Sequence, residues 1–432
     1  MMKNLATLLC LIVLSGASHA QHDNLSNLSA EWVRTPARNA ATEAGDIVVY
    51  NPAGMVRLND GFHINIGNQS LFRKPSHTFD FGLGMGEQSY TQDGNDLFLP
   101  NLYLSYKKDR FALFTGMFMA GGGATANYPE GSITTEMIGL QVLTAAQGAY
   151  GAYENQSLKA SSYYLTTTLG GAYSVNEKIS FALAGRFLNA TNKTQAGMTF
   201  TQSPMQLPDA RYELKTTETA SGFGGVISMM VQASPRTRFT ARYETAVNME
   251  FETNQQTDDF GMTEDGAISR RDLPAVFAAG LAFAATPAVM IYGDFNYYAQ
   301  SGANWDKSTV ITNEKNYADL AGDAIGINIA STFQTGKKLL LSIGGGYSDF
   351  QYSDRNGYFT KAGAFETAPD DNFNLNTGMS FMANEKMTFT LAYMHTFYKD
   401  QTLKAILAQP LDVTVKTSNS VDVLAIGVDL KF

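Results

Sequence analysis

The residues that could do acid–base or nucleophilic chemistry in this chain are few and lie far apart. The imidazole bases of the mature protein are His22, His63, His77 and His395. None lies beside a serine in the Gly-x-Ser-x-Gly setting of a hydrolase nucleophile. The one cysteine, Cys10, lies in a segment that we expect to be removed. We therefore do not expect an enzyme, because a nucleophile and a base must be held together.

Metal and polyanion sites are also not indicated. No His-x-x-x-His pair or carboxylate cluster has the spacing of metal ligands, so no metal site and no cofactor are expected. Three pairs are interpreted as solvated loop charges: His77 with Asp80, Asp93 with Asp96, and Asp370 with Asp371. The formal net charge of -9 argues against nucleic-acid binding, which draws on clustered lysine and arginine.

The first twenty residues have the organisation of a secretory signal peptide. Lys3 supplies a positive start, residues 5–14 form an apolar core, and residues 18–20 have the small-x-small cleavage pattern. We expect residues 1–20 to be removed and the mature chain to begin at Gln21.

From residue 61 onward, apolar and polar residues alternate in long segments. Phe181, Leu183 and Phe187, for example, alternate with Ser180 and Arg186. The segments are longer than the roughly 5 to 6 residues of soluble strands and match the roughly 9 to 11 that cross a bilayer at a tilt. Many apolar faces end in Tyr or Phe, as in an interfacial aromatic girdle. A transmembrane β-barrel is predicted rather than a soluble sandwich.

The connections between the segments alternate between tight turns and long polar loops. Six tight turns separate seven hairpins, which predicts a closed antiparallel barrel of 14 strands over residues 61–432. The predicted strands are 61–70, 97–107, 110–120, 158–174, 178–193, 219–233, 237–253, 271–285, 288–304, 318–334, 338–351, 369–383, 386–399 and 418–432. Short periplasmic turns and long external loops indicate the outer membrane of a Gram-negative bacterium.

Residues 21–60 do not alternate in this way. They are polar and rich in alanine, and they contain Pro36 and Pro52. The segment is too long for a tail and too short for a domain, so we expect it to plug the lumen as a hatch.

The sequence around Asn51-Pro52-Ala53-Gly54 resembles the hatch motif of the FadL family of outer-membrane long-chain fatty-acid transporters, which the TodX-type aromatic hydrocarbon transporters share. The motif follows an acidic, alanine-rich stretch and precedes the first predicted strand. Other similar stretches are 99–102, 172–176, 272–274, 393–395 and the terminal Phe432, so the resemblance covers essentially the whole mature chain.

The resemblance implies passive uptake of hydrophobic molecules, with long-chain fatty acids as the first expectation. In that family the cargo leaves sideways into the membrane through a gap made by an inward kink in the third strand. Here the third predicted strand runs into Gly121, Gly122 and Gly123, which supply backbone freedom and weaken regular pairing. These glycines are the candidate lateral gate; the alternative is a flexible exit into an external loop.

Residues 132–153 depart from alternation and are compatible with a short helix. Ile133, Met137 and Leu140 have helical spacing and are candidates for a loop that collects hydrophobic ligand. The alternative is a lid that packs on neighbouring loops.

Two other functions remain open at this point. An aromatic hydrocarbon transporter would have the same fold, and a general aqueous porin would suit inward charges such as Arg186, Arg242 and Glu244. A porin, however, has no use for a plug. If the cargo is a fatty acid, Arg186, Lys193 or Arg242 could pair with its carboxylate.

The chain ends in an aromatic residue on an alternating strand. Phe432 resembles the signal read by the bacterial barrel-assembly machinery. The other expected partners are hydrophobic small molecules and outer-membrane lipid, around a monomer. Deleting Phe432 should lower the amount of barrel in the outer membrane while secretion continues. An unchanged, heat-modifiable barrel in the membrane fraction would contradict this prediction.

Overall fold

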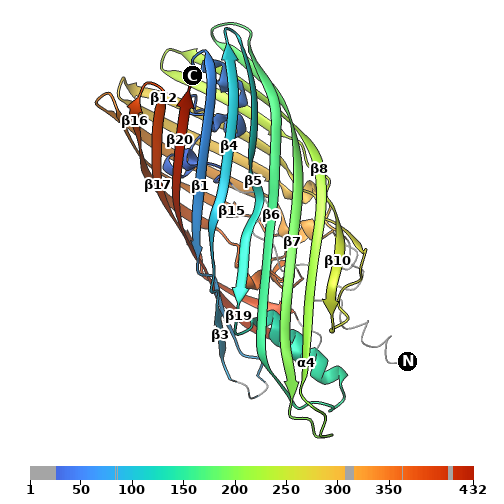
Figure 1. Ribbon diagram of the computed structural model, residues 1–432. Helices are drawn as coiled ribbons and strands as arrows, with labels where there is room; N and C mark the ends of the chain where they lie inside the picture. The colour runs from blue at the N-terminus through green and yellow to red at the C-terminus, as the bar shows by residue number, and fades with distance from the viewer. Residues whose placement is uncertain (1–25, 83, 85, 307–315, 362, 407–411) are drawn as a thin grey trace.

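Fourteen long antiparallel strands form a closed barrel (Figure 1). The computed structural model describes residues 26–82, 84, 86–306, 316–361, 363–406 and 412–432, so the predicted signal peptide and residues 21–25 lie outside the described residues. Strand β1 pairs with β20, with His63 opposite Lys431 and Arg73 opposite Val421, which closes the barrel. The barrel strands are β1 (Gly61–Arg73), β4 (Asn95–Lys108), β5 (Phe111–Tyr128), β6 (Ala152–Ser174), β7 (Ile179–Thr201), β8 (Ala210–Ser234), β9 (Thr237–Glu244), β12 (Ala275–Thr286), β13 (Val289–Ala299), β14 (Ala324–Thr335), β15 (Leu339–Phe350), β16 (Asn372–Asn384), β17 (Met387–Tyr398) and β20 (Ser420–Lys431).

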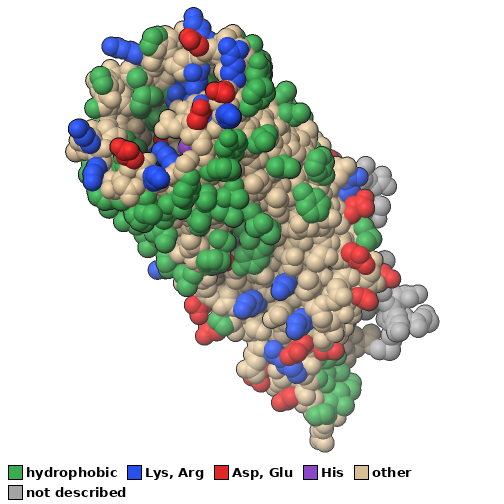
Figure 2. Space-filling model, turned by 45° about the horizontal axis from the view of Figure 1, so that its top comes forward, with side chains coloured by type: hydrophobic (Ala, Val, Ile, Leu, Met, Phe, Trp, Pro, Cys, Tyr) green, Lys and Arg blue, Asp and Glu red, His purple; other side chains and the backbone are tan. Residues whose placement is uncertain are grey.

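The outer face of the barrel is apolar over a continuous band. Side chains at alternate positions point outward, and Leu183, Phe223 and Ile329 are 69%, 71% and 63% exposed. On the face seen in Figure 2, hydrophobic side chains gather over the upper and middle part of the barrel wall. Such a surface is stable only in lipid, and a barrel of this kind spans the bacterial outer membrane. The predicted fold class is confirmed.

No described helix is long and apolar enough to cross a membrane.

The two ends of the barrel differ as predicted. Short turns and the C-terminus lie at the end drawn at the top of Figure 1, and the long connections lie at the other end. Four strands are much longer than expected: β5, β6, β7 and β8 have 18, 23, 23 and 25 residues. Their outer halves continue to pair with one another beyond the apolar band, where the outward positions are polar, so lipid contact does not limit their length.

The seventh predicted strand, 237–253, is broken in the structure. It consists of β9 and β10 (Glu250–Asp258), and β10 also pairs with the short β11 (Ile268–Arg270). Residues 245–249 bend over two glycines of β8. A Cβ on Gly222 would lie 2.5 Å from Val247 Cγ1, and one on Gly224 would lie 2.8 Å from Val247 Cγ2. Because these glycines have no side chains, the bent segment enters and narrows the lumen.

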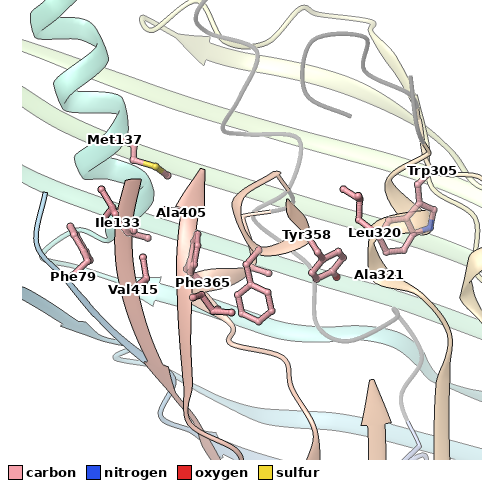
Figure 3. Close-up of a cluster of buried hydrophobic side chains, with 14 of the residues drawn as sticks. Phe79, Ile133, Met137, Trp305, Leu320, Ala321, Tyr358, Phe365, Ala405 and Val415 are labelled. Atoms are coloured by element: carbon pink, nitrogen blue, oxygen red, sulfur yellow. The ribbon is translucent and has the colours of Figure 1, made fainter. Parts of the chain in front are cut away.

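The long loops fold together into a structure that we call the external cap, and the sequence did not predict it. A second, four-stranded sheet consists of β2 (Ser76–Phe79), β3 (Gln88–Thr91), β18 (Gln401–Ile406) and β19 (Asp412–Ser418). Helices α4 (Ile133–Ala145), α5 (Tyr317–Ala321) and α6 (Arg355–Lys361) and the 3-10 turns η4 (Gln300–Gly302) and η5 (Ala364–Glu366) accompany it. Phe79, Ile133, Phe365 and Val415 pack in one hydrophobic cluster in the cap (Figure 3).

Charges that we interpreted as solvated are buried beneath the cap. Asp96 is 5% exposed and forms an ion pair with Arg73. Asp370 is 1% exposed, and its Oδ1 lies 3.2 Å from Arg355 Nη1. The interpretation was wrong for these two residues because each carboxylate is buried against an arginine.

His77 is also buried rather than solvated. Its Nε2 accepts a hydrogen bond of 3.0 Å from the backbone N–H of Ile133, the first residue of α4. The ring lies among Phe79, Tyr90 and Tyr128. Burial lowers the pKa of His77 from 6.5 to about 3, so the imidazole is neutral in the folded cap.

This buried imidazole predicts that acid loosens the cap. Above pH 6.5 the cap has its full stability, because His77 is neutral in the folded and in the unfolded chain. As the pH falls from 6.5 toward 3, the unfolded chain binds a proton that the folded cap does not. The cap therefore loses up to about 1.4 kcal/mol of stability per pH unit. Amide exchange in α4, corrected for the intrinsic rate, should be faster at pH 5 than at pH 7. The variant His77→Gln should have a flatter pH profile. Equal protection of native α4 at the two pH values would contradict the prediction.

Candidate transport site in the barrel lumen

The N-terminal segment lies inside the barrel, at the end with the short turns (Figure 1). It contains α2 (Ala30–Arg34), α3 (Ile47–Tyr50) and η3 (Pro52–Arg57). Helix α2 packs against β16, β17 and β20, whereas η3 packs against β6, β7 and β8 on the other side of the lumen. Ala30, Ile47 and Ala53 are fully buried. The segment thus contacts opposite walls of the barrel.

Buried ion pairs hold this segment in one conformation. Arg38 Nη2 lies 2.5 Å from Asp46 Oδ1, and Arg38 also pairs with Glu43. Ser29, which caps α2, donates its hydroxyl hydrogen to Asp46 Oδ2 at 2.8 Å. Arg38 and Asp46 are fully buried, so replacing Arg38 would leave the Asp46 carboxylate buried without its cation, which costs about 3 to 5 kcal/mol.

The motif residue Asn51 joins α3 to η3, and Pro52, Ala53 and Gly54 form the buried first turn of η3. Asn51 Nδ2 donates to the carbonyl of Ala41 at 2.7 Å, and Pro52 opens η3 with its fixed φ. A Cβ on Gly54 would lie 2.4 Å from Asn51 Nδ2. The Ser180 hydroxyl of β7 donates to the carbonyl of Ala53 at 2.7 Å. Asn51, Pro52 and Gly54 therefore each have a structural reason for their residue type.

A small cavity, which we call the inner cavity, lies between this segment and the barrel wall. Its volume is about 60 Å³. Trp32 and Val48 line it from the N-terminal segment, and Phe118 and Ala120 line it from β5. The volume is far below the roughly 300 Å³ or more of most ligand sites, so a ligand needs the segment or the wall to move.

A second cavity, the upper cavity, adjoins the inner one. It has a volume of about 130 Å³ and is lined by polar residues such as Asn328 and Asn374, and by Gly122 of β5. The two cavities share Trp32 and Tyr298. Strand β5 therefore lines both cavities. Phe118 and Ala120 line the inner cavity, and Gly122 lines the upper cavity.

A third cavity, the vestibule, lies on the other side of the N-terminal segment. Its volume is about 340 Å³, and it is lined by Glu31 and Arg34 of α2, by Met290 and Met382 of the wall, and by residues of the short turns. The segment thus separates the inner cavity from the vestibule.

Strand β5 loses its pairing with β4 at the candidate gate. The ladder between β4 and β5 begins with the pair Lys108–Phe111 and ends with the pair Leu102–Met117. Strand β5, in contrast, remains paired with β6 as far as Tyr128. Contact with the β4 side resumes where Thr125 Oγ1 donates to Asp96 Oδ1 at 2.6 Å. Between these points the neighbouring backbones are not paired, and this interval is the ladder break.

The glycines lie at the ladder break, within β5 rather than in a loop. The β5–β6 register shifts between Met119 and Gly121 and again between Gly122 and Ala124. Gly122 has a φ of +67°, and a Cβ there would lie 2.5 Å from the carbonyl oxygen of Ser162 on β6. Only glycine fits both the φ and the close approach. The double bulge bends β5 away from regular pairing with β4.

Two of the three candidate carboxylate partners reach the lumen. Arg186 pairs with Glu244 and donates from Nη2 to the carbonyl of Thr245 at 2.7 Å. Arg242 donates from Nη1 to the carbonyls of Val49 at 2.6 Å and Tyr50 at 2.5 Å. Arg242 Nε also lies 3.0 Å from Glu244 Oε1. Both cations line the inner cavity, but Glu244 already neutralises part of their charge.

Lys193 does not share this site. It lies on the outer face of β7, between the buried and inward-facing Asn192 and Thr194, so it cannot meet a ligand in the lumen. The candidate collecting residues also lie elsewhere than expected. Ile133 and Met137 are buried in the core of the external cap, and Leu140 packs against it. The helix itself is present as α4.

Within the described residues, no group of three or more His, Cys, Asp or Glu side chains could hold a metal ion.

The fold was compared with known proteins. No family model matches the sequence, and no curated protein matches it. A FadL homologue from Pseudomonas aeruginosa superposes with a TM-score of 0.68 at 12% identity, covering 95% of this chain and 100% of that one. The toluene transporter TodX of P. putida gives 0.65 at 12% identity, with 95% and 99% covered. The Ralstonia pickettii toluene transporter TbuX gives 0.61 at 15% identity, with 95% and 99% covered.

This chain has the fold of the FadL and TodX transporters. The matches cover almost the full length of both chains in each case. Identities of 12% to 15% are consistent with conserved architecture and divergent side chains. The FadL-like barrel is thus established as a fold, and its cargo must be inferred from its own residues.

Proposed function

We propose that this barrel carries hydrophobic molecules passively across the outer membrane and releases them sideways at the ladder break in β5. The observation that supports this most is the position of the break. The break lies beside the inner and upper cavities. The N-terminal segment separates both cavities from the vestibule, so the break is on the external side of that segment.

The route follows from the burial of apolar surface. A ligand enters past the external cap, passes the upper cavity and reaches Trp32, Val48 and Phe118, where each buried CH₂ contributes about 0.8 kcal/mol. The ladder break is then the short path to lipid, and it avoids the ion pairs of the N-terminal segment. No energy source is needed for movement down a concentration gradient.

Two cargo classes are supported by different observations. Arg186 and Arg242 line the inner cavity and favour the carboxylate of a long-chain fatty acid. Glu244 pairs with both of them, and this partial neutralisation favours an uncharged aromatic hydrocarbon. We take the fatty acid as the first proposal and the aromatic hydrocarbon as the second.

Uptake of labelled oleate and labelled toluene, measured side by side in cells lacking their own transporters, tests both proposals. The native chain should raise uptake of at least one of them several-fold over a vector control. The variant Glu244→Gln removes the carboxylate that pairs with both arginines. It should shift the preference toward oleate, because the carboxylate of oleate can then take the place of Glu244. Uptake of neither compound would overturn the proposed function.

A further inference from the structure

Three lysines lie together on the outer face of the barrel, between the apolar band and the external cap. Lys159 is on β6, Lys193 on β7 and Lys215 on β8, and all three are exposed. Gln195 lies opposite both Lys159 and Lys215, and Lys193 is two residues away along the same strand. Lys193 is therefore a diagonal neighbour of both other lysines, at about 7 to 8 Å between backbones. We call these residues the lysine triad.

No described carboxylate forms an ion pair with the triad. None of its members forms an ion pair or a side-chain hydrogen bond with another described residue. The outward carboxylate Glu213 lies two residues from Lys215 and faces Arg211, with Nε and Oε1 3.4 Å apart. Glu218 lies on the inward face of β8, opposite Asn192. Three unpaired cations at adjacent positions are notable in a chain with a net charge of -9.

The triad also lies at a defined height on the barrel. The last outward aromatic residue before it is Tyr163 on β6, which lies opposite Thr191 on β7. Lys193 is two residues beyond Thr191. At a rise of about 3.3 Å per residue and a tilt of about 40°, this is about 5 Å along the membrane normal. In Figure 2, Lys and Arg side chains lie on the mostly polar surface just below the hydrophobic band.

This height corresponds to the polar layer of the outer leaflet. The triad lies on the side of the external cap, whereas the short turns lie at the opposite end of the barrel (Figure 1). Lysine side chains extend several ångströms and bend toward the lipid interface. A ligand there would place acyl chains on the aromatic band and negative charge against the ammonium groups.

We propose that Lys159, Lys193 and Lys215 bind the phosphorylated headgroup of an outer-leaflet glycolipid. Ammonium groups recognise phosphate oxygens through short, charge-assisted hydrogen bonds, and three lysines in one plane match a headgroup that carries more than one phosphate. The site lies outside the lumen and does not depend on the proposed transport function.

The variant K159Q/K193Q/K215Q tests the proposal. The purified full-length protein is placed in phosphatidylcholine nanodiscs with bisphosphorylated lipid A, and bound lipid A is counted by native mass spectrometry. Binding to the native barrel should exceed binding to the variant by about 100-fold, since each lysine near a charged lipid surface contributes about fivefold. The control K178Q/K337Q/K386Q removes the same charge from exposed turns at the opposite end and should bind as the native chain does.

Two further arms of the experiment identify the source of the phosphate. Dephosphorylated lipid A should bind the native protein and the triad variant equally weakly, and millimolar inorganic phosphate should not displace lipid A from the native barrel. Equal binding of bisphosphorylated lipid A to native protein and triad variant would overturn the proposal. Loss of binding in the turn-lysine control, or displacement by inorganic phosphate, would also overturn it.

Discussion

The variant Gly122→Val should lose most of its ligand uptake, by about tenfold or more, while the barrel still folds. Gly122 has a φ of +67°, and an added Cβ would lie 2.5 Å from the carbonyl oxygen of Ser162. Valine has no access to that φ and favours regular pairing. The double bulge must therefore rearrange, and β5 can then pair with β4 through the interval that is now open.

The same substitution elsewhere in the barrel provides the control. Gly293 lies in β13, and a Cβ there would meet no atom within 4 Å, so Gly293→Val should leave uptake unchanged. Heat-modifiable migration reports the amount of folded barrel in each case, and binding of ligand from outside should persist in both variants. If Gly122→Val takes up ligand at the native rate, the exit lies elsewhere and the glycines only shape the strand.

Deleting residues 26–58 should convert the barrel into an open aqueous channel. The ladder closes through β1 and β20 without this segment, so the barrel should still form. The exposed lumen would then be lined by polar residues such as Arg186, Asp294 and Asn328. In planar bilayers the native protein should show almost no conductance and the deletion variant large, steady conductance. Large conductance by the native protein would instead favour a general porin.

A single substitution gives a graded version of this prediction. Asn51→Ala removes the hydrogen bond to the carbonyl of Ala41 and should give brief channel openings rather than a steady current. The matched control is Asn68→Ala, which removes a hydrogen bond to Leu97 on the outer side of β1 and β4 and should stay closed. Equal behaviour of the two variants would show that the Asn51 turn does not hold the segment in place.

The barrel was predictable because its signals are local. Alternation identifies each strand from its own residues, and tight turns give the count. The external cap was not predictable in this way, because Phe79, Ile133, Phe365 and Val415 come from four separate loops. The break between β9 and β10 was also not predictable, because its cause, the glycines of β8, lies in another strand.

The prediction that Lys193 could pair with a ligand carboxylate was wrong for a different reason. The sequence itself shows that Lys193 does not face the lumen. Lys193 is separated from Phe187 by six residues and from Arg186 by seven. In a strand, an even separation places side chains on one face and an odd separation on opposite faces. Lys193 therefore shares the lipid-facing side of Phe187, and Arg186 shares the lumen side with Arg242.

Lateral exit is tested most directly by mapping where a moving ligand contacts the protein. Oleate carrying a diazirine on its acyl chain is supplied from outside to the native barrel, photolysed during uptake, and located by peptide mass spectrometry. The account predicts adducts along the ladder break, at residues such as Leu102, Met117 and Phe118. Adducts concentrated in the vestibule, at Met290 and Met382, would contradict it and show that the ligand passes the N-terminal segment into the periplasm.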